Sequence, residues 1–420
     1  MQSLQMTAAA TATVIEPTFA EAPSAEPLDI TLLSTADWSH PLWTNKQHMA
    51  CALAKLGHRV LYIDSLASRK PRRSSSDFRR IVRRLSSMSA PLIARRDNIW
   101  SIAPTVIPWH EKEAVARFNR LLLRSNLDLA GMRLGLRRQV LLTYSPLTTR
   151  LLDISRYDQV VYHCVDDIAA QPDMPSDLIR ECEKELVASA DCVFSTHPNL
   201  YARTERINQS SYYQPNVADY DHFYSALKPG SIPEDLAAIP GPRLIFIGAI
   251  ANYKVDMKLL NRLAEERPEY QLVLIGPVGE GEGDTDISQL KQRKNVHFLG
   301  TRTYRELPAY LRGADVAMLP CQLNDYTSAM FPMKFFEYLA AGRPVVATQL
   351  PALREFSNSC FVSGSHEEFI EHVDRAITGG GPLLQDRLRL ARRYTYATRT
   401  EAMLKTMQRV GGLHSSQAWA

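Results

Sequence analysis

The chain has 420 residues, too many for one hydrophobic core of ordinary size, so we expect two domains. Hydrophobic residues make up 45% of it, charged residues 22%, and the net charge is only +4, which excludes a wholly disordered or collagen-like chain. Its six cysteines form no C-x-x-C pair and no apolar run reaches about 18 residues, so we expect neither a zinc or disulfide framework nor a membrane span, as in a cytoplasmic protein.

Residues 1–28 are rich in Ala, Thr, Pro and Glu. They lack the charged-then-apolar layout of a signal peptide, and we expect a disordered tail.

From residue 29 onward, short apolar runs alternate with segments of helical periodicity, which favours α/β layers with parallel sheets. In the first half the expected strands are 30–34, 59–63, 99–103, 140–143, 160–164 and 192–195, and the expected helices are 44–56, 113–129 and 177–189. These define a first domain over residues 29–226.

A break follows at residues 227–242, where four prolines and two glycines predict an interdomain linker. The pattern then restarts and defines a second domain over residues 243–384. Its expected strands are 244–248, 272–275, 296–299, 316–319 and 345–347, its expected helices include 305–312 and 334–341, and a last helix is expected over 385–410.

The fold class predicted from this order is α/β, with two Rossmann-like doubly wound domains facing a cleft. Ligands of such sheets bind beyond the carboxyl ends of the strands, so the loops there are the place to look for chemistry.

The most informative segment is SAMFPMKFFEYLAAGRPVVAT, residues 328–348. Pro332 marks the start of a short helix and Gly342 its end. Free N–H groups at the helix start and the charge of Lys334 favour a diphosphate. Glu337, one turn later, suits hydrogen bonds from sugar hydroxyls. Alternatively, the segment is only a capped helix and a strand, with Glu337 a solvated charge.

At these residues the sequence resembles the GT-B glycosyltransferases, especially bacterial polysaccharide enzymes of the family-4 type. Met333, Lys334 and position 337 are also similar to the xanthan glucuronosyltransferase type, which has Gln where this chain has Glu337. The resemblance implies that Lys334 contacts the donor pyrophosphate and that Glu337 holds the ribose. It also implies that the preceding loop contacts the donor, and the candidates in that loop are Asn324, Ser328 and Phe331.

One position departs from the family. Many family-4 enzymes carry a Glu-x7-Glu motif, in which the second Glu matches Glu337, but the first position here is Ala329. The missing carboxylate usually touches the donor sugar, so the sequence does not name the sugar or the stereochemistry of transfer.

The first loop of the second domain, GAIANYK, places Gly248 after a strand and Lys254 six residues later. This resembles the family's phosphate-contacting loop, in which a glycine admits the backbone close to the ligand. A plain strand–turn–helix with an exposed lysine is the equal alternative.

In the first domain, HCVDD at residues 163–167 ends a buried strand. Sugar transfer needs a group that accepts or orients the proton of the acceptor hydroxyl, and a carboxylate or an imidazole suits this role. Our order of preference for the catalytic residue is Asp166, then His163, then Asp167. Alternatively, one of the acids caps the next turn.

The loop DWSHPLWTNKQH at residues 37–48 also follows a strand. We expect Trp38, His40, Trp43 and Asn45 to line an acceptor pocket, by resemblance to the teichuronic-acid and exopolysaccharide type. Packing of the two tryptophans in the core is the alternative.

Positive charge is concentrated between Arg69 and Arg138, with 17 Lys and Arg against five Asp and Glu. Apolar residues recur among the arginines at helical spacing in 78–85 and again in 114–138, a pattern of basic amphipathic helices that bind anionic membranes. The alternatives are a solvated surface or a nucleic-acid patch. No nucleic-acid motif accompanies the charge, so we expect no nucleic-acid partner.

Together these features predict a glycosyltransferase, hexosyl or glycuronosyl, of bacterial surface polysaccharide synthesis. Its donor is expected to be a UDP-sugar, or alternatively a GDP-sugar, and its acceptor a lipid-linked glycan at the inner face of the plasma membrane. No metal is expected, because protein groups stabilise the negative charge that develops on the departing nucleoside diphosphate. A nucleotide-sugar epimerase of the same fold and a non-catalytic membrane scaffold are the alternatives.

Overall fold

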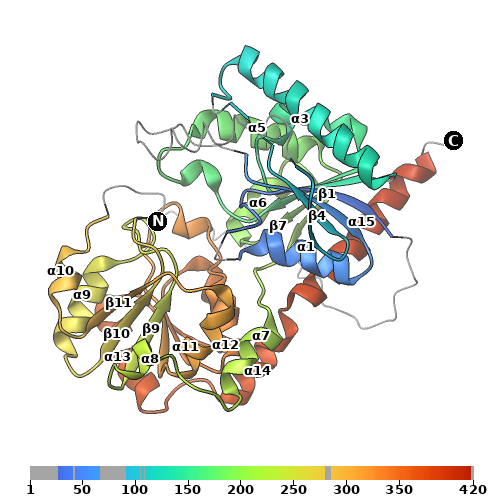
Figure 1. Ribbon diagram of the computed structural model, residues 1–420. Coiled ribbons are helices and arrows are strands. Elements are labelled where there is room, and N and C mark those ends of the chain that lie inside the picture. Colours follow the sequence, from blue (N-terminus) through green and yellow to red (C-terminus); the bar gives the residue numbers. More distant parts are fainter. Residues whose placement is uncertain are drawn as a thin grey trace, which may run out of the picture.

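The computed structural model describes residues 27–40, 43–66, 91–104, 106–107, 109–137, 139–279 and 285–417. The expected tail, except for its last two residues, and the basic segment 69–90 lie outside these ranges. The described strands form two sheets, one in each half of the chain (Figure 1).

The first sheet has the order β3-β4-β2-β1-β5-β6-β7-β8 and is parallel except for the β3–β4 pair. Its strands are β1 (Asp29–Leu33), β2 (Arg59–Ile63), β3 (Ile93–Arg96), β4 (Ile99–Ile102), β5 (Gln139–Thr143), β6 (Gln159–Cys164), β7 (Cys192–Ser195) and β8 (Ser211–Tyr213). Its helices are α1 (Asn45–Lys55), α3 (Glu113–Leu134), α4 (Thr148–Leu151), α5 (Ser176–Ser189) and α6 (Pro198–Glu205).

All residues of β1, β6 and β7 are buried, because helices cover both faces of the sheet and leave no solvent side. This explains why these strands are near-continuous apolar runs in the sequence.

The second sheet is parallel throughout and has the order β11-β10-β9-β12-β13-β14. Its strands are β9 (Arg243–Ile247), β10 (Gln271–Ile275), β11 (Val296–Gly300), β12 (Val316–Leu319), β13 (Val345–Thr348) and β14 (Phe361–Ser363). Its helices are α7 (Tyr220–Tyr224), α8 (Glu234–Ala237), α9 (Met257–Glu266), α10 (Ser288–Gln292), α11 (Leu307–Arg312), α12 (Lys334–Ala340), α13 (His366–Ile377) and α14 (Leu384–Arg393). The two doubly wound α/β domains predicted from the sequence are therefore present.

The segment 227–242 differs from the free linker that its prolines suggest. Leu236 of α8 and Ile239 are buried in the core of the second domain, as are Tyr220 and Phe223 of α7. The chain therefore enters the second domain soon after β8, and the prolines shape a packed segment.

The last part of the chain forms two helices where one was expected. Helix α14 packs on α12, whereas α15 (Tyr396–Gln417) leaves the second domain and runs back along the first, where it packs on α1 (Figure 1). Met403, Leu404 and Met407 of α15 join the apolar cluster of the first domain, and the backbone oxygen of Met407 accepts a hydrogen bond from Gln159 at 2.8 Å. Within the described part of the chain, no helix combines the length and apolarity needed to cross a bilayer.

Candidate functional site between the two domains

Helix α12 begins at Lys334, directly after Met333, which is half-buried. The helix ends before Gly342, whose φ of +72° favours glycine, and a Cβ there would meet side-chain carbons of Leu227 and Leu384 at 2.8 and 2.9 Å. Phe335, Phe336, Tyr338 and Leu339 are fully buried. Packing of these side chains therefore fixes the position of the helix start.

Lys334 and Glu337 are paired one turn apart. The Lys334 Nζ lies 2.6 Å from Glu337 Oε2, and Glu337 is 1% exposed, whereas the lysine retains some exposure. Burial raises the pKa of Glu337, and Lys334 opposes that shift. His48 of the first domain has a pKa of about 3. Burial is the main cause, and the positive charges of Lys334 and of Arg399 in α15 also lower this pKa. Lys334 is therefore close enough to the first domain to influence the charge of a residue there.

The loop before α12 is held by its own side chains. The Asn324 amide donates to the backbone oxygen of Tyr253 at 2.8 Å, and its Oδ1 accepts from the backbone N–H of Thr327 at 3.0 Å. Phe331 is 2% exposed and packs on Phe336 with the rings stacked 5.6 Å apart. The Asn324 and Phe331 side chains therefore shape the loop, and the expected contact of this loop with a donor stays a prediction.

The same loop is bound to the first domain by contacts that the sequence did not predict. Asn199 of α6 donates to the backbone oxygen of Ser328 at 2.9 Å, and Asn216 donates to that of Phe331 at 2.7 Å. Ala329 is 7% exposed and belongs to the apolar cluster of the first domain. Single asparagines, one in a short helix and one in a loop, carry no periodic signal, so these two were not recognisable in the sequence.

Gly248 and Lys254 lie on the loop after β9. The loop after β10 passes so close that a Cβ on Gly276 would lie 1.9 Å from the Gly248 oxygen, which accounts for glycine at position 276. Lys254 is half-buried, and its Nζ lies 5.3 Å from the centre of the Tyr253 ring. Lys254 lowers the pKa of Asp166, so the two residues influence each other across the domain interface.

Asp166 follows β6 and is partly exposed. Burial raises the pKa of its carboxyl group, while Lys46 of α1 and Lys254 of the second domain lower it. Asp166 therefore lies between a cation of each domain.

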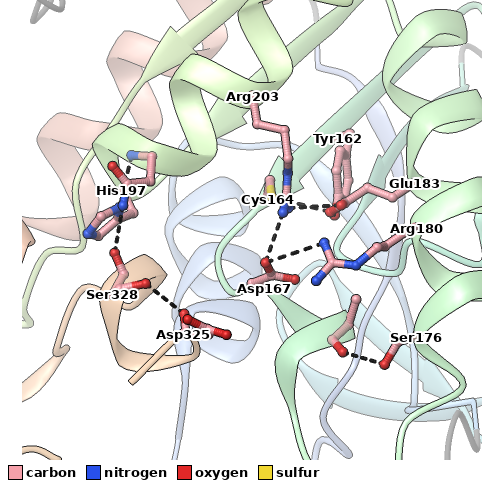
Figure 2. A network of polar contacts seen from close by, with 12 residues as sticks. Tyr162, Cys164, Asp167, Ser176, Arg180, Glu183, His197, Arg203, Asp325 and Ser328 are labelled. Carbon is pink, nitrogen blue, oxygen red and sulfur yellow. Dashed lines mark hydrogen bonds and ion pairs between the residues drawn. The ribbon is translucent and has the colours of Figure 1, made fainter. Parts of the chain in front are cut away.

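The other two acid–base candidates are more enclosed. His163 is 0% exposed, its Nδ1 lies 3.1 Å from the Tyr144 hydroxyl, and burial holds its pKa well below the usual range. Asp167 contacts Arg203 at 2.9 Å and Arg180 at 3.8 Å, as Figure 2 shows. Arg203 also binds Glu183 at 2.9 Å, so Asp167 belongs to an ion-pair network within the first domain.

The four residues expected in an acceptor pocket separate into two groups. Trp38 and Asn45 are 8% and 2% exposed, which for Trp38 agrees with the alternative of core packing, and their place in an acceptor pocket stays a prediction. Trp38 packs in the core, and Asn45 donates to Asn216 Oδ1 at 2.8 Å. His40 and Trp43 are half-buried, and the Trp43 ring stacks on Tyr304 of the second domain with centres 6.4 Å apart. The loop is therefore partly an interdomain contact.

The described residues contain no group of three or more His, Cys, Asp or Glu side chains arranged to hold a metal ion.

Several known proteins are similar to this chain. Residues 241–379 match the family model described as "Glycosyl transferases group 1". The putative teichuronic acid biosynthesis glycosyltransferase TuaH of Bacillus subtilis is 29% identical over 253 residues, which are 55% of this chain and 62% of TuaH. This chain therefore spans about three fifths of the length of that relative.

Solved structures share the fold over nearly the whole chain. HepE of Anabaena, crystallised with UDP and glucose, has a TM-score of 0.65 at 15% identity and covers 91% of this chain and 99% of its own. Sucrose-phosphate synthase of Thermosynechococcus elongatus has a TM-score of 0.63 at 16% identity and covers 93% and 99%. Residues 241–379 are therefore similar to the group 1 glycosyltransferases, and the chain as a whole has the GT-B fold found in family-4-like glycosyltransferases.

Proposed function

We propose that the protein transfers a sugar from a UDP-sugar to a glycan acceptor in the synthesis of a bacterial surface polysaccharide. The observation that carries the proposal is the Lys334–Glu337 pair at the start of α12, at 2.6 Å and close to the first domain. The solved HepE structures with UDP and UDP-glucose support UDP as the nucleotide, and the printed name of TuaH supports the polysaccharide.

In the proposed reaction the nucleotide sugar lies against the second domain. Lys334 and Lys254 stabilise the departing diphosphate, so positive charge is supplied by the protein where negative charge develops. Glu337 accepts hydrogen bonds from the ribose hydroxyls once the diphosphate draws Lys334 away from it. No step of this scheme requires a metal ion.

Asp166 is the proposed group that receives the proton of the acceptor hydroxyl. Its partial exposure allows contact with an acceptor, and burial raises the pKa of its carboxyl group toward a value useful for a base. His163 is covered and Asp167 is engaged by two arginines, which supports Asp166 over both.

We also propose that α3 holds the enzyme at an anionic membrane, where a lipid-linked acceptor is presented. Phe118, Leu121 and Met132 of α3 are 49%, 64% and 73% exposed, beside the exposed Arg117 and Arg124. A groove of about 860 Å³ follows this helix, and its lining includes Arg117, Arg120, Arg124 and Arg156 as well as Asp128, Asp153 and Glu185. Apolar side chains flanked by arginines suit the boundary between headgroups and acyl chains.

The donor test is a thermal-shift and calorimetric screen of UDP, GDP and ADP with their sugars. We expect UDP to bind, and we expect Lys334→Ala to raise the dissociation constant of UDP at least tenfold. No binding of any nucleotide would overturn the proposal and leave the scaffold alternative. Conversion of a UDP-sugar into its epimer without an acceptor would instead identify an epimerase.

The membrane test is flotation with neutral vesicles and with vesicles that contain phosphatidylglycerol. We expect flotation only with the anionic vesicles and its loss in Leu121→Asp/Met132→Asp. Leu383→Asp is the matched control, because Leu383 is 71% exposed in the second domain. Absence of flotation of the unaltered protein with either vesicle would overturn this part of the proposal.

A further inference from the structure

A buried chain of hydrogen bonds joins the returning helix α15 to the loop that leads into α12. Arg399 Nη2 donates to Asn45 Oδ1 at 3.0 Å, and Asn45 Nδ2 donates to Asn216 Oδ1 at 2.8 Å. Asn216 Nδ2 in turn donates to the backbone oxygen of Phe331 at 2.7 Å. All four residues are only 2% to 3% exposed, and we call them the amide relay.

Only one direction of donation is possible along the amide relay. A guanidinium has donors and no acceptor, whereas a backbone carbonyl has lone pairs and no donor. The Arg399 end therefore requires the oxygen of Asn45, and the Phe331 end requires the NH2 group of Asn216. Both side-chain amides are thereby fixed in orientation, so a change at one end of the relay alters the other end. The buried charge of Arg399 also strengthens the relay, because consecutive hydrogen bonds polarise one another.

The amide relay lies where two connections between the domains pass each other. Asn45 is the first residue of α1, and Arg399 belongs to α15, which packs on α1. Asn216 is two positions before Ala218, whose backbone N–H donates to the oxygen of Tyr394 at 3.0 Å. Ala218 lies in the connection that leaves the first domain, and Tyr394 lies in the one that returns to it. The relay therefore ties α15, α1 and the connection after β8 to the loop before α12.

The last hydrogen bond of the relay lies next to the proposed diphosphate site. Phe331 is three positions before Lys334, the first residue of α12, and its ring stacks on Phe336 of the same helix with centres 5.6 Å apart. The relay thus holds the backbone of Phe331, while the stacked rings hold its side chain. The direction in which the chain enters α12, and with it the position of Lys334, is therefore fixed in part from the first domain.

We propose that Asn216 is a positioning residue for donor binding and that it acts through the amide relay. Asn216 does not touch the donor; it holds the Phe331 carbonyl so that Lys334 is in place for the diphosphate. The first domain and α15 thereby contribute to the binding of a nucleotide that lies against the second domain. The inference rests on the proposed function, because it requires a diphosphate at Lys334.

Two variants separate positioning from packing. Asn216→Ala removes both hydrogen bonds of the Asn216 side chain. Asn45→Asp keeps the size of the side chain and places a carboxylate beside Arg399, whose Nε and Nη1 have no hydrogen-bond partner among the described residues. The second carboxylate oxygen then requires the NH2 group of Asn216, so the oxygen of Asn216 is left against the Phe331 carbonyl and the two repel. Asn45→Asp therefore preserves stability but breaks the last hydrogen bond of the relay.

Asn119→Ala is the matched control. Asn119 is 0% exposed, and its side chain donates to the backbone oxygen of Ile107 and accepts from the backbone N–H of the same residue, both at 2.8 Å. Its replacement therefore removes two buried hydrogen bonds that lie within the first domain. Calorimetry gives the dissociation constant of UDP for the unaltered protein and the three variants, and melting curves give their stability. Hydrogen exchange of residues 331–337, measured without UDP, reports on the start of α12.

We expect Asn216→Ala and Asn45→Asp each to raise the dissociation constant of UDP about fivefold or more, the effect of about one lost hydrogen bond. Both variants should also speed hydrogen exchange of residues 331–337. Asn119→Ala should change the dissociation constant less than twofold, although it lowers the melting temperature as Asn216→Ala does. The melting temperature of Asn45→Asp should equal or exceed that of the unaltered protein, so lost stability does not explain its weaker binding of UDP.

An Asn45→Asp protein that binds UDP as tightly as the unaltered protein would overturn the inference, and this variant decides the matter even if Asn216→Ala does not fold. Equal weakening of UDP binding by Asn119→Ala and Asn216→Ala would also overturn it, since lost stability alone would then account for both. If the unaltered protein binds no UDP, the proposed function fails. Unchanged hydrogen exchange of residues 331–337 in Asn45→Asp is instead the failure of the relay itself, so the two failures are distinguishable.

Discussion

The Lys334 Nζ lies 2.6 Å from Glu337 Oε2, so the two groups expected to bind opposite ends of a nucleoside diphosphate neutralise each other. Glu337 is almost fully buried, whereas Lys334 retains an exposed edge. A diphosphate can therefore compete for the lysine, while the carboxylate remains in place for a sugar hydroxyl.

This pairing predicts different results for one single variant and for a double variant built on it. Lys334→Met leaves the Glu337 carboxylate buried and unpaired, which we expect to lower the free energy of unfolding by about 2–4 kcal/mol, somewhat less than for a fully buried pair. Glu337→Gln in the Lys334→Met background should recover most of that loss, because no buried charge remains, but should not recover UDP binding.

Urea denaturation and calorimetry with UDP measure both quantities. Lys258→Met, on the exposed face of α9, is the control. Recovery of UDP affinity in the double variant would contradict the role assigned to Lys334.

Asp166 and Asp167 are adjacent, yet the structure predicts opposite consequences when each is replaced by asparagine. Asp166→Asn should abolish most turnover with little change in melting temperature, since Asp166 is the proposed base and its carboxylate is partly exposed. Asp167→Asn breaks the contact with Arg203 and should cost about 1–3 kcal/mol of stability with turnover largely kept. Initial rates and melting curves of both variants test this; full turnover of Asp166→Asn would remove it as the base.

The sequence predicted much of the fold, and the reasons are visible in particular elements. The runs at 59–63 and 192–195 coincide with β2 and β7, because strands buried on both faces must be continuously apolar. The helix at Lys334 was predicted because proline, glycine and apolar residues mark its ends locally. By contrast, three of the four residues of β3 are exposed, among them Arg96, and its place at the sheet edge is set by pairing with β4 alone.

The site could be predicted from the sequence only where the residues in contact are close together in the chain. Lys334 and Glu337 are one turn apart, so their proximity follows from the helix. Asn216 and Phe331 are 115 positions apart, and Asn45 and Arg399 are 354 apart, so their contacts depend on how the two domains and the returning helix meet. The prolines of 227–242 did not show that this turn-rich segment is also packed, as Leu236 and Ile239 are.

A further prediction concerns Ala329, which stands where many family-4 enzymes have the first Glu of the Glu-x7-Glu motif. The Ala329 side chain packs in the apolar cluster of the first domain, and the adjacent Ser328 oxygen accepts from Asn199. Ala329→Glu would place a carboxylate against apolar side chains, so we expect a loss of about 1–3 kcal/mol and a looser contact between the loop and α6. Ala329→Ser, of similar size and uncharged, should be much milder.

Melting curves and hydrogen exchange of residues 324–331 measure these effects. Unchanged stability of Ala329→Glu together with tighter donor binding would show that the loop readily turns this position toward the donor.

The hydrogen bond between Asn199 and the Ser328 oxygen should depend on pH through His197. This histidine precedes α6, is 0% exposed, and its Nδ1 accepts a hydrogen bond from the backbone N–H of Asn199 at 3.0 Å. Burial lowers its pKa to about 4. Protonation of Nδ1 would remove the acceptor that caps α6, the helix from which Asn199 reaches Ser328.

Between about pH 6.5 and pH 4, the unfolded chain therefore takes up a proton at His197 that the folded protein does not bind. The free energy of unfolding must then fall as the pH falls through this range, by up to about 1.4 kcal/mol per pH unit from this residue. His197→Asn keeps an oxygen that can accept from Asn199 but cannot titrate, so its stability should depend less steeply on pH. Urea denaturation of both proteins at pH 7, 6 and 5 gives the two slopes. Equal slopes would show that His197 titrates alike in the folded and unfolded protein, and that the cap does not respond to pH.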